Sequence, residues 1–426
     1  MGEFLFAVWE GGGNVAPTLG AVRRLVARGH RVRVLADDTA RTEVEAAGAL
    51  FRPWRSAPNR PDRRPETCYL QDWTAKDPGG ELLALLDRVT IGPAAAHAAD
   101  TLAELRRAPA DAVVSSDLLF GPLIAAEAAS VPAAVLAVNV SVMAPIPGMP
   151  PVGPGMAPPR TPAEHAMAAE AAAWFAARLN ERLPVLNAAR AGFGLAPLAD
   201  AFDQPRRAAM TLLATSRAFD FDVPALPDGM RYVGPLLDEP DWARGWTAPW
   251  RDARPLVLVA MSTTFQDQVG VIQRLLDAAA TLPVRVVATL GPALEGTALR
   301  VPCNAAVIAR GSHDALMAEA ALVVTHGGHG TVMRALSHGR PLLCIPMGRD
   351  QNDNAARVVT RGAGLRLDRD APEEALRAAI ATLLDDPRHA AAAAALGEAI
   401  AATDPKDALV EALEELAARE PCRCAA

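Results

Sequence analysis

A glycine-rich turn follows an apolar run in the string ALVVTHGGHGTVMRAL at 321–336. The turn holds three glycines: Gly327, Gly328 and Gly330. The pattern predicts a buried strand, this turn, and a helix that begins near Thr331. Glycines let backbone N–H groups approach a ligand, and the first turn of a helix attracts anions through unpaired amides and its dipole. With the Thr331 hydroxyl and the His326 ring as further donors, the turn predicts a phosphate site.

Asp350 and Gln351 follow the next apolar run, in PLLCIPMGRDQNDNAARV at 341–358. Ligands of open α/β sheets bind beyond the carboxyl ends of the strands. A carboxylate beside a carboxamide offers acceptors and an amide donor, which suits neighbouring hydroxyls. We therefore expect this pair to bind a sugar.

A second glycine loop lies near the N-terminus, in FAVWEGGGNVAPTLGAVRRL at 6–25. Here an apolar run ends, three glycines follow, and Pro17 opens a helical pattern. Loops of this kind often hold a phosphate, so this one is either a nucleotide loop or free of side chains for another reason.

The elements around these loops alternate between strand and helix. Strands are expected at 4–9, 31–36, 111–115 and 133–138, with helices at 17–28 and 123–129. Repeated units at this spacing predict a parallel sheet with helices on both faces. The same alternation returns after a polar connection at 238–254, with strands at 256–260, 284–290, 305–309, 321–325 and 341–345. We therefore expect an α/β chain of two domains, 1–237 and 255–426, with its last helix packed back on the first domain.

The segment 144–162 is rich in Pro, Gly and Met and predicts no regular structure. A helix is expected from 163 to about 190. The segment is either a surface linker or a mobile, apolar rim over a binding cleft. Met149 and Met156, with Met143 just before the segment, favour the rim slightly, because methionine adapts to irregular apolar surfaces.

Composition limits the classes of function. The 426 residues are 51% apolar and 21% charged, with a net charge of −7. A globular protein in the cytoplasm is expected, with no nucleic-acid partner and no membrane partner. His326, His329 and His338 match no recurrent zinc spacing, so no metal is expected.

The two strings THGGHGT and PMGRDQNDNAARV resemble the donor-site signature of family 1 glycosyltransferases that act on natural products. GHRVRVLAD at 29–37 and YVGPLL at 232–237 extend the similarity. The resemblance implies the GT-B fold, in which two Rossmann-like domains with parallel sheets face each other across a cleft. It also implies a nucleoside-diphosphate sugar in the C-terminal domain and sugar transfer with inversion and without metal.

The resemblance assigns roles in the donor site. His326 and the amides of 327–331 would hold the diphosphate, and Asp350 and Gln351 the sugar hydroxyls. Ser262 and Thr263 would add contacts to phosphate. The nucleobase of the donor would lie against the loop VIARGSHDALM at 307–317, where the family often has an aromatic residue and a Gln. This chain has Arg310 and His313 there, and a guanidinium can also stack on a base.

By the same resemblance, the N-terminal glycine loop forms the surface of the cleft on which the acceptor molecule lies. In relatives this loop ends in the His or Asp that deprotonates the acceptor, but here the matching residue is Asn14, which takes up no proton. Asp117, at the position that normally supports the His, and Glu10 are candidate bases. Otherwise Asp117 caps the next helix and Glu10 is a solvated loop residue. Alternatively, an acidic acceptor needs only positioning by Asn14.

The sequence thus predicts a metal-independent hexosyltransferase. It would move a hexose or deoxyhexose from a UDP- or dTDP-sugar, a co-substrate and not a cofactor, to an apolar secondary metabolite, as in antibiotic biosynthesis. A catalytically silent sugar-nucleotide-binding protein and a nucleotide-sugar epimerase of the same fold stay open as alternatives. A homodimer is also left open.

Overall fold

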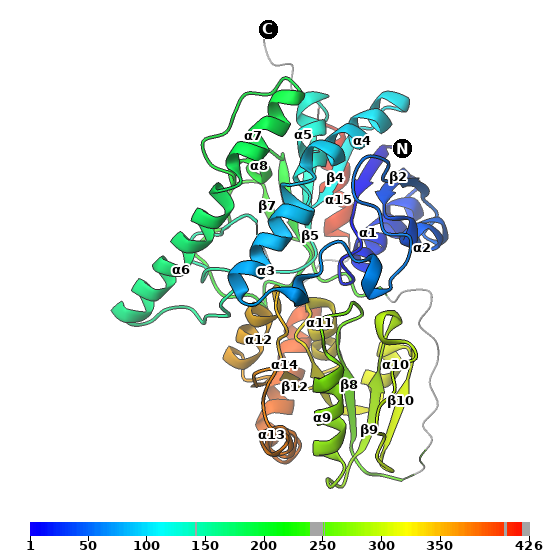
Figure 1. Ribbon diagram of the computed structural model, residues 1–426, viewed down its shortest axis with the longest axis vertical. Coiled ribbons are helices and arrows are strands. Elements are labelled where there is room, and N and C mark those ends of the chain that lie inside the picture. Colours follow the sequence, from blue (N-terminus) through cyan, green and yellow to red (C-terminus); the bar gives the residue numbers. More distant parts are fainter. Residues whose placement is uncertain (141–142, 239–249, 251, 404–406, 420–426) are drawn as a thin grey trace.

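The computed structural model describes residues 1–140, 143–238, 250, 252–403 and 407–419. Most of the expected connection at 238–254, residues 239–249 and 251, lies outside these described residues. The chain forms two parallel sheets, one in each half, with helices packed around them (Figure 1). The predicted α/β class with two Rossmann-like halves is therefore confirmed.

The N-terminal half is built on a sheet of seven strands in the order β3-β2-β1-β4-β5-β6-β7. Its strands are β1 (Glu3–Ala7), β2 (Arg31–Ala36), β3 (Leu50–Pro53), β4 (Ala112–Ser116), β5 (Ala133–Ala137), β6 (Met210–Leu213) and β7 (Met230–Tyr232). Every neighbouring pair is parallel, and the strands are mostly apolar and buried because helices cover both faces. The strand order reverses between β1 and β4, so a crevice is expected at their carboxyl ends. The N-terminal glycine loop and Asp117 follow these two strands.

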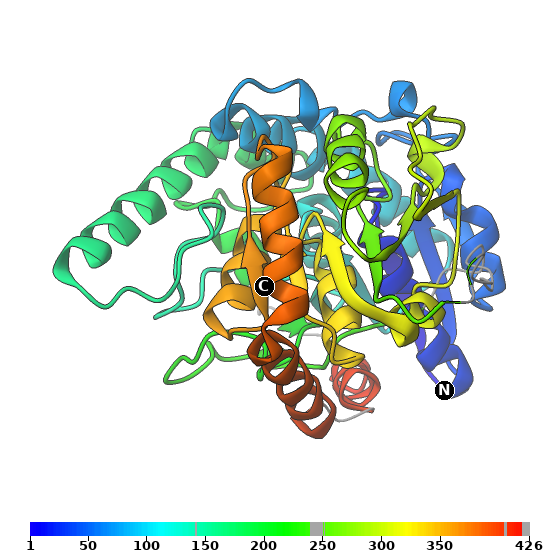
Figure 2. The same ribbon diagram turned by 90° about the horizontal axis from the view of Figure 1, so that it is seen from below.

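The helices of this half are α1 (Val15–Ala27), α2 (Arg41–Ala46), α3 (Pro78–Leu85), α4 (Ala94–Arg107), α5 (Phe120–Ala128), α6 (Pro162–Asn180), α7 (Leu183–Gly192) and α8 (Asp203–Arg206). The helix expected from 163 to 190 is thus two helices. A capping box of Thr161 and Glu164 starts α6, which extends away from the body of the protein in both views (Figures 1 and 2). Between β5 and α6, the described part of 144–161 contains neither helix nor strand.

The C-terminal half has six parallel strands in the order β10-β9-β8-β11-β12-β13. They are β8 (Leu256–Ala260), β9 (Arg285–Thr289), β10 (Ala305–Ile308), β11 (Ala320–Thr325), β12 (Leu342–Cys344) and β13 (Gly364–Arg366). Their helices are α9 (Val269–Ala279), α10 (His313–Glu319), α11 (His329–Ser337), α12 (Gln351–Thr360), α13 (Glu373–Asp385) and α14 (Pro387–Thr403). The order reverses between β8 and β11, and the loops that follow these strands carry Ser262 and His326.

The final helix, α15 (Ala408–Ala417), returns to the first half (Figure 1). Its apolar face, with Leu409, Leu413 and Leu416, belongs to the same buried cluster as Phe4 and Val34 of the first sheet. The chain therefore crosses between its two halves twice.

Candidate functional site

A chamber of about 1170 Å³ lies between the two halves, at the carboxyl ends of both sheets. The two glycine loops and the Asp350 turn line it, as the resemblance implied. Of the predicted site residues, twelve line this chamber: Glu10, Asn14, Asp117, Ser262, Thr263, His313, His326, Gly328, Gly330, Thr331, Asp350 and Gln351. Arg310 and Gly327 are absent from its lining.

The C-terminal glycine turn is shaped by close contacts. Gly327 has a φ of +88°, and a Cβ there would lie 3.0 Å from the Gln351 carbonyl oxygen. A Cβ on Gly328 would lie 2.4 Å from Nε2 of His326, so only glycine leaves room for this ring. Helix α11 begins at His329, two residues before the expected Thr331. Thr331 therefore lies in the first turn of α11, where amides and dipole favour an anion.

His326 is held in its neutral form. Burial, together with the positive charge of Arg349, lowers the pKa of the ring to about 3, although a hydrogen bond to the Ala260 backbone acts in the opposite direction. The other two histidines of the region have different partners. His329 Nε2 lies 2.9 Å from Thr215 Oγ1, and His338 Nε2 lies 3.1 Å from Asp314 Oδ1. Among the described residues, no three His, Cys, Asp or Glu side chains gather as metal ligands would.

The loop after β8 is braced by its own side chains. Ser262 Oγ lies 3.1 Å from Thr264 Oγ1, and Gln268 Nε2 donates to the carbonyl oxygens of both residues. The N-terminal glycine loop touches this loop: a Cβ on Gly12 would lie 2.5 Å from Thr264 Cγ2 and 3.1 Å from Thr263 Oγ1. Gly12 thus allows the two loops to meet across the chamber.

The loop at 307–317, which is expected to receive the nucleobase, differs from expectation at Arg310. Its guanidinium donates to Glu295 Oε2 at 2.9 Å and does not line the chamber, so this conformation brings no stacking guanidinium to the base site. Pro292 and Gly311 line that side of the chamber and were missed from the sequence. His313 does line it, with Nε2 3.2 Å from Thr289 Oγ1.

Asp350 and Gln351 differ in what their side chains offer. Asp350 Oδ2 accepts a hydrogen bond from Asn354, and burial raises the pKa of this carboxyl. Gln351 is 2% exposed. Its Oε1 accepts from the Met347 N–H at 2.7 Å, and its Nε2 donates to Gln266 Oε1 at 3.1 Å. The Gln351 carboxamide therefore braces the turn in this structure, and its role toward a sugar stays a prediction.

The N-terminal glycine loop is closed by Asn14. Its Nδ2 donates to the Trp9 carbonyl oxygen at 2.7 Å, and its Oδ1 accepts from the Gly11 N–H at 3.1 Å. The side chain that matches the family base thus holds the loop in shape.

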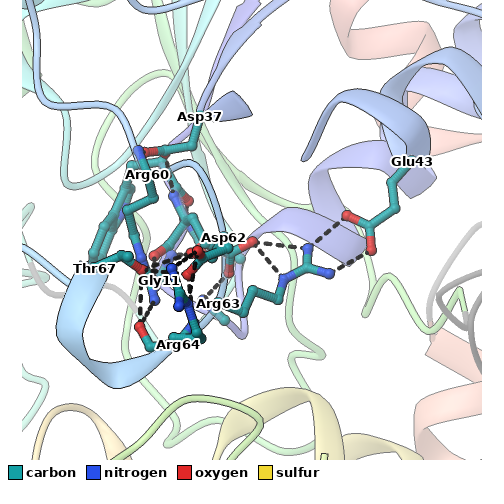
Figure 3. A network of polar contacts seen from close by, with 12 residues as sticks. Gly11, Asp37, Glu43, Arg60, Asp62, Arg63, Arg64 and Thr67 are labelled. Carbon is teal, nitrogen blue, oxygen red and sulfur yellow. Dashed lines mark hydrogen bonds and ion pairs between the residues drawn. The ribbon is translucent and has the colours of Figure 1, made fainter. Parts of the chain in front are cut away.

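Glu10 is buried in an ionic network, with 1% of its surface exposed. Its Oε1 accepts from the Gly12 N–H, and its Oε2 accepts twice from Arg63. Arg63 also forms two hydrogen bonds to Glu43 (Figure 3). Asp37 accepts from the backbone N–H groups of Glu10 and Arg60. The expectation of a solvated loop residue is therefore wrong, and this carboxylate is committed to holding the loop.

Asp117 has a different environment. It follows β4, is 4% exposed, and its Oδ2 has no hydrogen-bond partner among the described residues. Burial, together with the negative charge of Asp350, raises the pKa of this carboxyl to about 7. Helix α5 begins at Phe120 after Leu119, so Asp117 is not its N-cap. The helix-capping alternative is wrong; Asp117 lines the chamber, and Oδ2 of its carboxyl is buried without a hydrogen-bond partner among the described residues.

One side of the chamber is apolar. It is lined by Leu82, Leu85, Val152, Pro154, Met156, Met167, Trp174 and Phe175. The Pro- and Met-rich segment contributes three of these residues, so it does form a rim of the chamber. Asp353 of α12 binds this rim by accepting the N–H groups of Gly153 and Gly155 at 2.8 and 2.9 Å.

Within the described ranges, no helix combines the length and the apolar character that crossing a bilayer requires.

Comparison with known proteins agrees with this geometry. Residues 273–416 match the family described as erythromycin biosynthesis protein CIII-like, C-terminal domain. The chain is 30% identical over 422 residues to 4'-demethylrebeccamycin synthase of Lentzea aerocolonigenes, covering 96% of this chain and 97% of the relative. Its fold is similar to that of the kitacinnamycin glycotransferase, with a TM-score of 0.76 at 22% identity over 97% and 98% of the two chains. It is also similar to spinosyn rhamnosyltransferase SpnG complexed with thymidine diphosphate, with a TM-score of 0.67 at 21% identity over 97% and 100%.

Proposed function

Because the chain belongs to the glycosyltransferases of natural-product pathways, which have the GT-B fold, we propose that it transfers a sugar with inversion to an apolar small molecule. The donor is a hexose or deoxyhexose carried by UDP or dTDP. The thymidine diphosphate in the similar spinosyn enzyme supports the choice of dTDP as one of the two carrier nucleotides to be tested.

The observation that carries this proposal is the Oδ2 atom of Asp117, a carboxyl oxygen with no hydrogen-bond partner among the described residues, while Oδ1 accepts from the Ser116 hydroxyl at 3.4 Å. A general base works best when its pKa lies near the working pH and its proton-accepting atom is not already bonded. Asp117 Oδ2 meets both conditions, with a pKa raised to about 7. Asp117 and Asp350 both line the chamber, and the negative charge of Asp350 contributes to the raised pKa of Asp117, which supports a base close to the proposed sugar site.

The donor would bind at the C-terminal glycine turn. The N-terminal amides of α11, the Thr331 hydroxyl and the Ser262–Thr264 loop would hold the diphosphate, and Asp350 would accept from a sugar hydroxyl. The apolar wall of Leu82, Met156 and Trp174 would cover the acceptor. An apolar wall is favourable only for an apolar ligand, because burial of apolar surface drives such binding.

The reaction is a single displacement. Asp117 Oδ2 takes the proton of the acceptor hydroxyl as its oxygen attacks the anomeric carbon. The bond from that carbon to the diphosphate oxygen breaks on the opposite face, so the configuration inverts. The negative charge that develops on the leaving diphosphate is stabilised by the helix amides and by Thr331.

A product assay tests the proposal. The full chain is incubated with UDP- and dTDP-sugars and a set of apolar aromatic and polyketide acceptors, and products are identified by mass spectrometry. The anomeric configuration of the product is then read from proton coupling constants. We expect transfer with inversion; a retained configuration, or a donor that is bound but never transferred or hydrolysed, would refute the proposed reaction.

A further inference from the structure

Arg349 lies between the proposed sugar site and the acceptor loop, next to Asp350 in the chain. We infer that Arg349 is a positioning residue: it fixes the N-terminal glycine loop relative to Asp350, so that the acceptor hydroxyl lies next to the anomeric carbon of the sugar. The inference rests on the proposed function. The residue precedes the sugar-binding carboxylate, lines the chamber, and has a side chain 23% exposed.

The guanidinium of Arg349 binds three separate segments. It forms a fork with Asp72, with Nε 2.5 Å from Oδ2 and one terminal nitrogen 3.0 Å from Oδ1. The other terminal nitrogen donates to the Gly11 carbonyl oxygen at 3.2 Å and to Thr264 Oγ1 at 3.3 Å. A planar, two-pronged donor fixes orientation as well as distance, which an ammonium group does not. One side chain therefore joins the acceptor loop, the loop after β8 and the turn at Asp72.

The backbone at this point is also constrained. Arg349 has a φ of +57°, a conformation that residues other than glycine adopt rarely and keep only where their surroundings enforce it. The preceding Gly348 has a φ of +142°, and a Cβ there would lie 2.6 Å from Glu81 Oε2 of α3. The close approach of α3 from the other half shapes this turn. This backbone conformation directs the Arg349 side chain toward the N-terminal glycine loop.

Asp72 sets the electrostatic role of Arg349. Asp72 is 6% exposed, and both of its oxygens are taken by the guanidinium. The positive charge is thus paired within the protein, which favours a role in geometry over a role as a phosphate ligand. This distinction separates a positioning residue from a phosphate ligand.

Other contacts hold the two halves together without Arg349. Arg357 of α12 forms a buried ion pair with Asp220 at 2.7 Å, and His329 contacts Thr215. Asp353 binds the rim segment at Gly153 and Gly155. The loss of Arg349 should therefore misplace the acceptor loop locally while the halves stay together.

The test compares Arg349→Met, Arg349→Lys and Asp72→Asn with the wild type, and uses Arg388→Met as a matched control. Arg388 is an exposed arginine that forms a similar fork with Asp386 outside the chamber. We expect Arg349→Met to lower kcat for transfer by about 10- to 100-fold, because small misplacements of reacting groups have effects of that size. The dissociation constant for UDP or dTDP should change by no more than about threefold.

Three further readouts follow from the geometry. The ratio of sugar transfer to donor hydrolysis should fall in Arg349→Met, because water replaces a misplaced acceptor. Asp72→Asn should act in the same direction, and Arg349→Lys should recover part of kcat. Amide hydrogen exchange in the peptide that contains Gly11 to Asn14 should be faster in Arg349→Met than in the wild type or in Arg388→Met, whether or not an acceptor is known.

Two results would overturn the inference. An equal loss of nucleotide affinity and kcat would reassign Arg349 to the phosphate. Unchanged exchange in the glycine loop, with the variant folded, would show that Arg349 does not hold it. If the wild type transfers no sugar but the exchange difference is present, the proposed function fails and the positioning contact stands.

Discussion

Asp117→Asn is the substitution that best separates the mechanisms. It removes the proton-accepting charge and keeps the size of the side chain. General-base catalysis typically contributes about 10²–10⁴-fold, so we expect kcat/KM to fall by that factor with acceptors that are ordinary alcohols. In the wild type kcat/KM should rise with pH up to about 7, the pKa of Asp117, and then level off. This rise should be absent from the variant.

The same substitution should stabilise the fold at high pH. Below about pH 4 the carboxyl is protonated in both folded and unfolded chains. As the pH rises from about 4 to about 7, the unfolded chain has released this proton while the folded chain still holds it, so stability is lost across this range; above about pH 7 the folded chain holds a buried charge. The rise of the pKa from 3.8 to about 7 corresponds to about 4 kcal/mol, at about 1.4 kcal/mol per unit. We take this value as the upper bound of the increase in the free energy of unfolding that Asp117→Asn causes above pH 8.

The assay combines both readouts. Initial rates of transfer are measured from about pH 5 to 9 with acceptors of graded acidity, and urea unfolding is followed at both ends of this range. Asp203→Asn serves as control, because Asp203 lies on α8 outside the chamber and is 39% exposed. If Asp117→Asn keeps most of its activity and the rate follows the acceptor's own ionisation, the acceptor supplies its own acidity and Asp117 is not the base. A variant no more stable than the wild type at high pH would contradict the buried charge itself.

Three other predictions follow from the site. Thr331→Val should weaken UDP or dTDP binding by about 1.5–3 kcal/mol, measured by calorimetry, since a hydrogen bond to a charged group is lost; unchanged affinity would place the phosphate elsewhere. Asp353→Asn should raise the KM for the acceptor far more than that for the donor, because one of the two N–H groups of Gly153 and Gly155 loses its carboxylate partner; equal effects on both would argue against a strap on the acceptor rim. Glu10→Gln should lower the free energy of unfolding by about 1–3 kcal/mol in urea while nucleotide affinity persists, since Arg63 loses a buried partner; a stable variant that has lost transfer would return Glu10 to the candidate bases.

The fold and the donor loop could be predicted from the sequence because their signals are local. Alternating apolar runs and helical spacing predicted both parallel sheets, and a strand, three glycines and a helix within sixteen residues predicted the turn at 327–330. The start of α11 was misplaced by two residues, because local spacing fixes the end of a helix only to within one or two residues. The break between α6 and α7 was missed for a similar lack of local signal.

The roles of individual polar side chains were decided by the tertiary structure. Whether a carboxylate acts as a base depends on burial and partners that come from distant segments. Glu10 and Asp117 both follow apolar strands, yet Arg63 neutralises the first, while Oδ2 of the second is buried without a hydrogen-bond partner among the described residues. Gln351 lies in a motif that resembles the family's, yet its carboxamide donates to Gln266 and accepts from the Met347 N–H. Arg349 owes its place to Asp72, 277 residues earlier, and no spacing in the sequence could have indicated that contact.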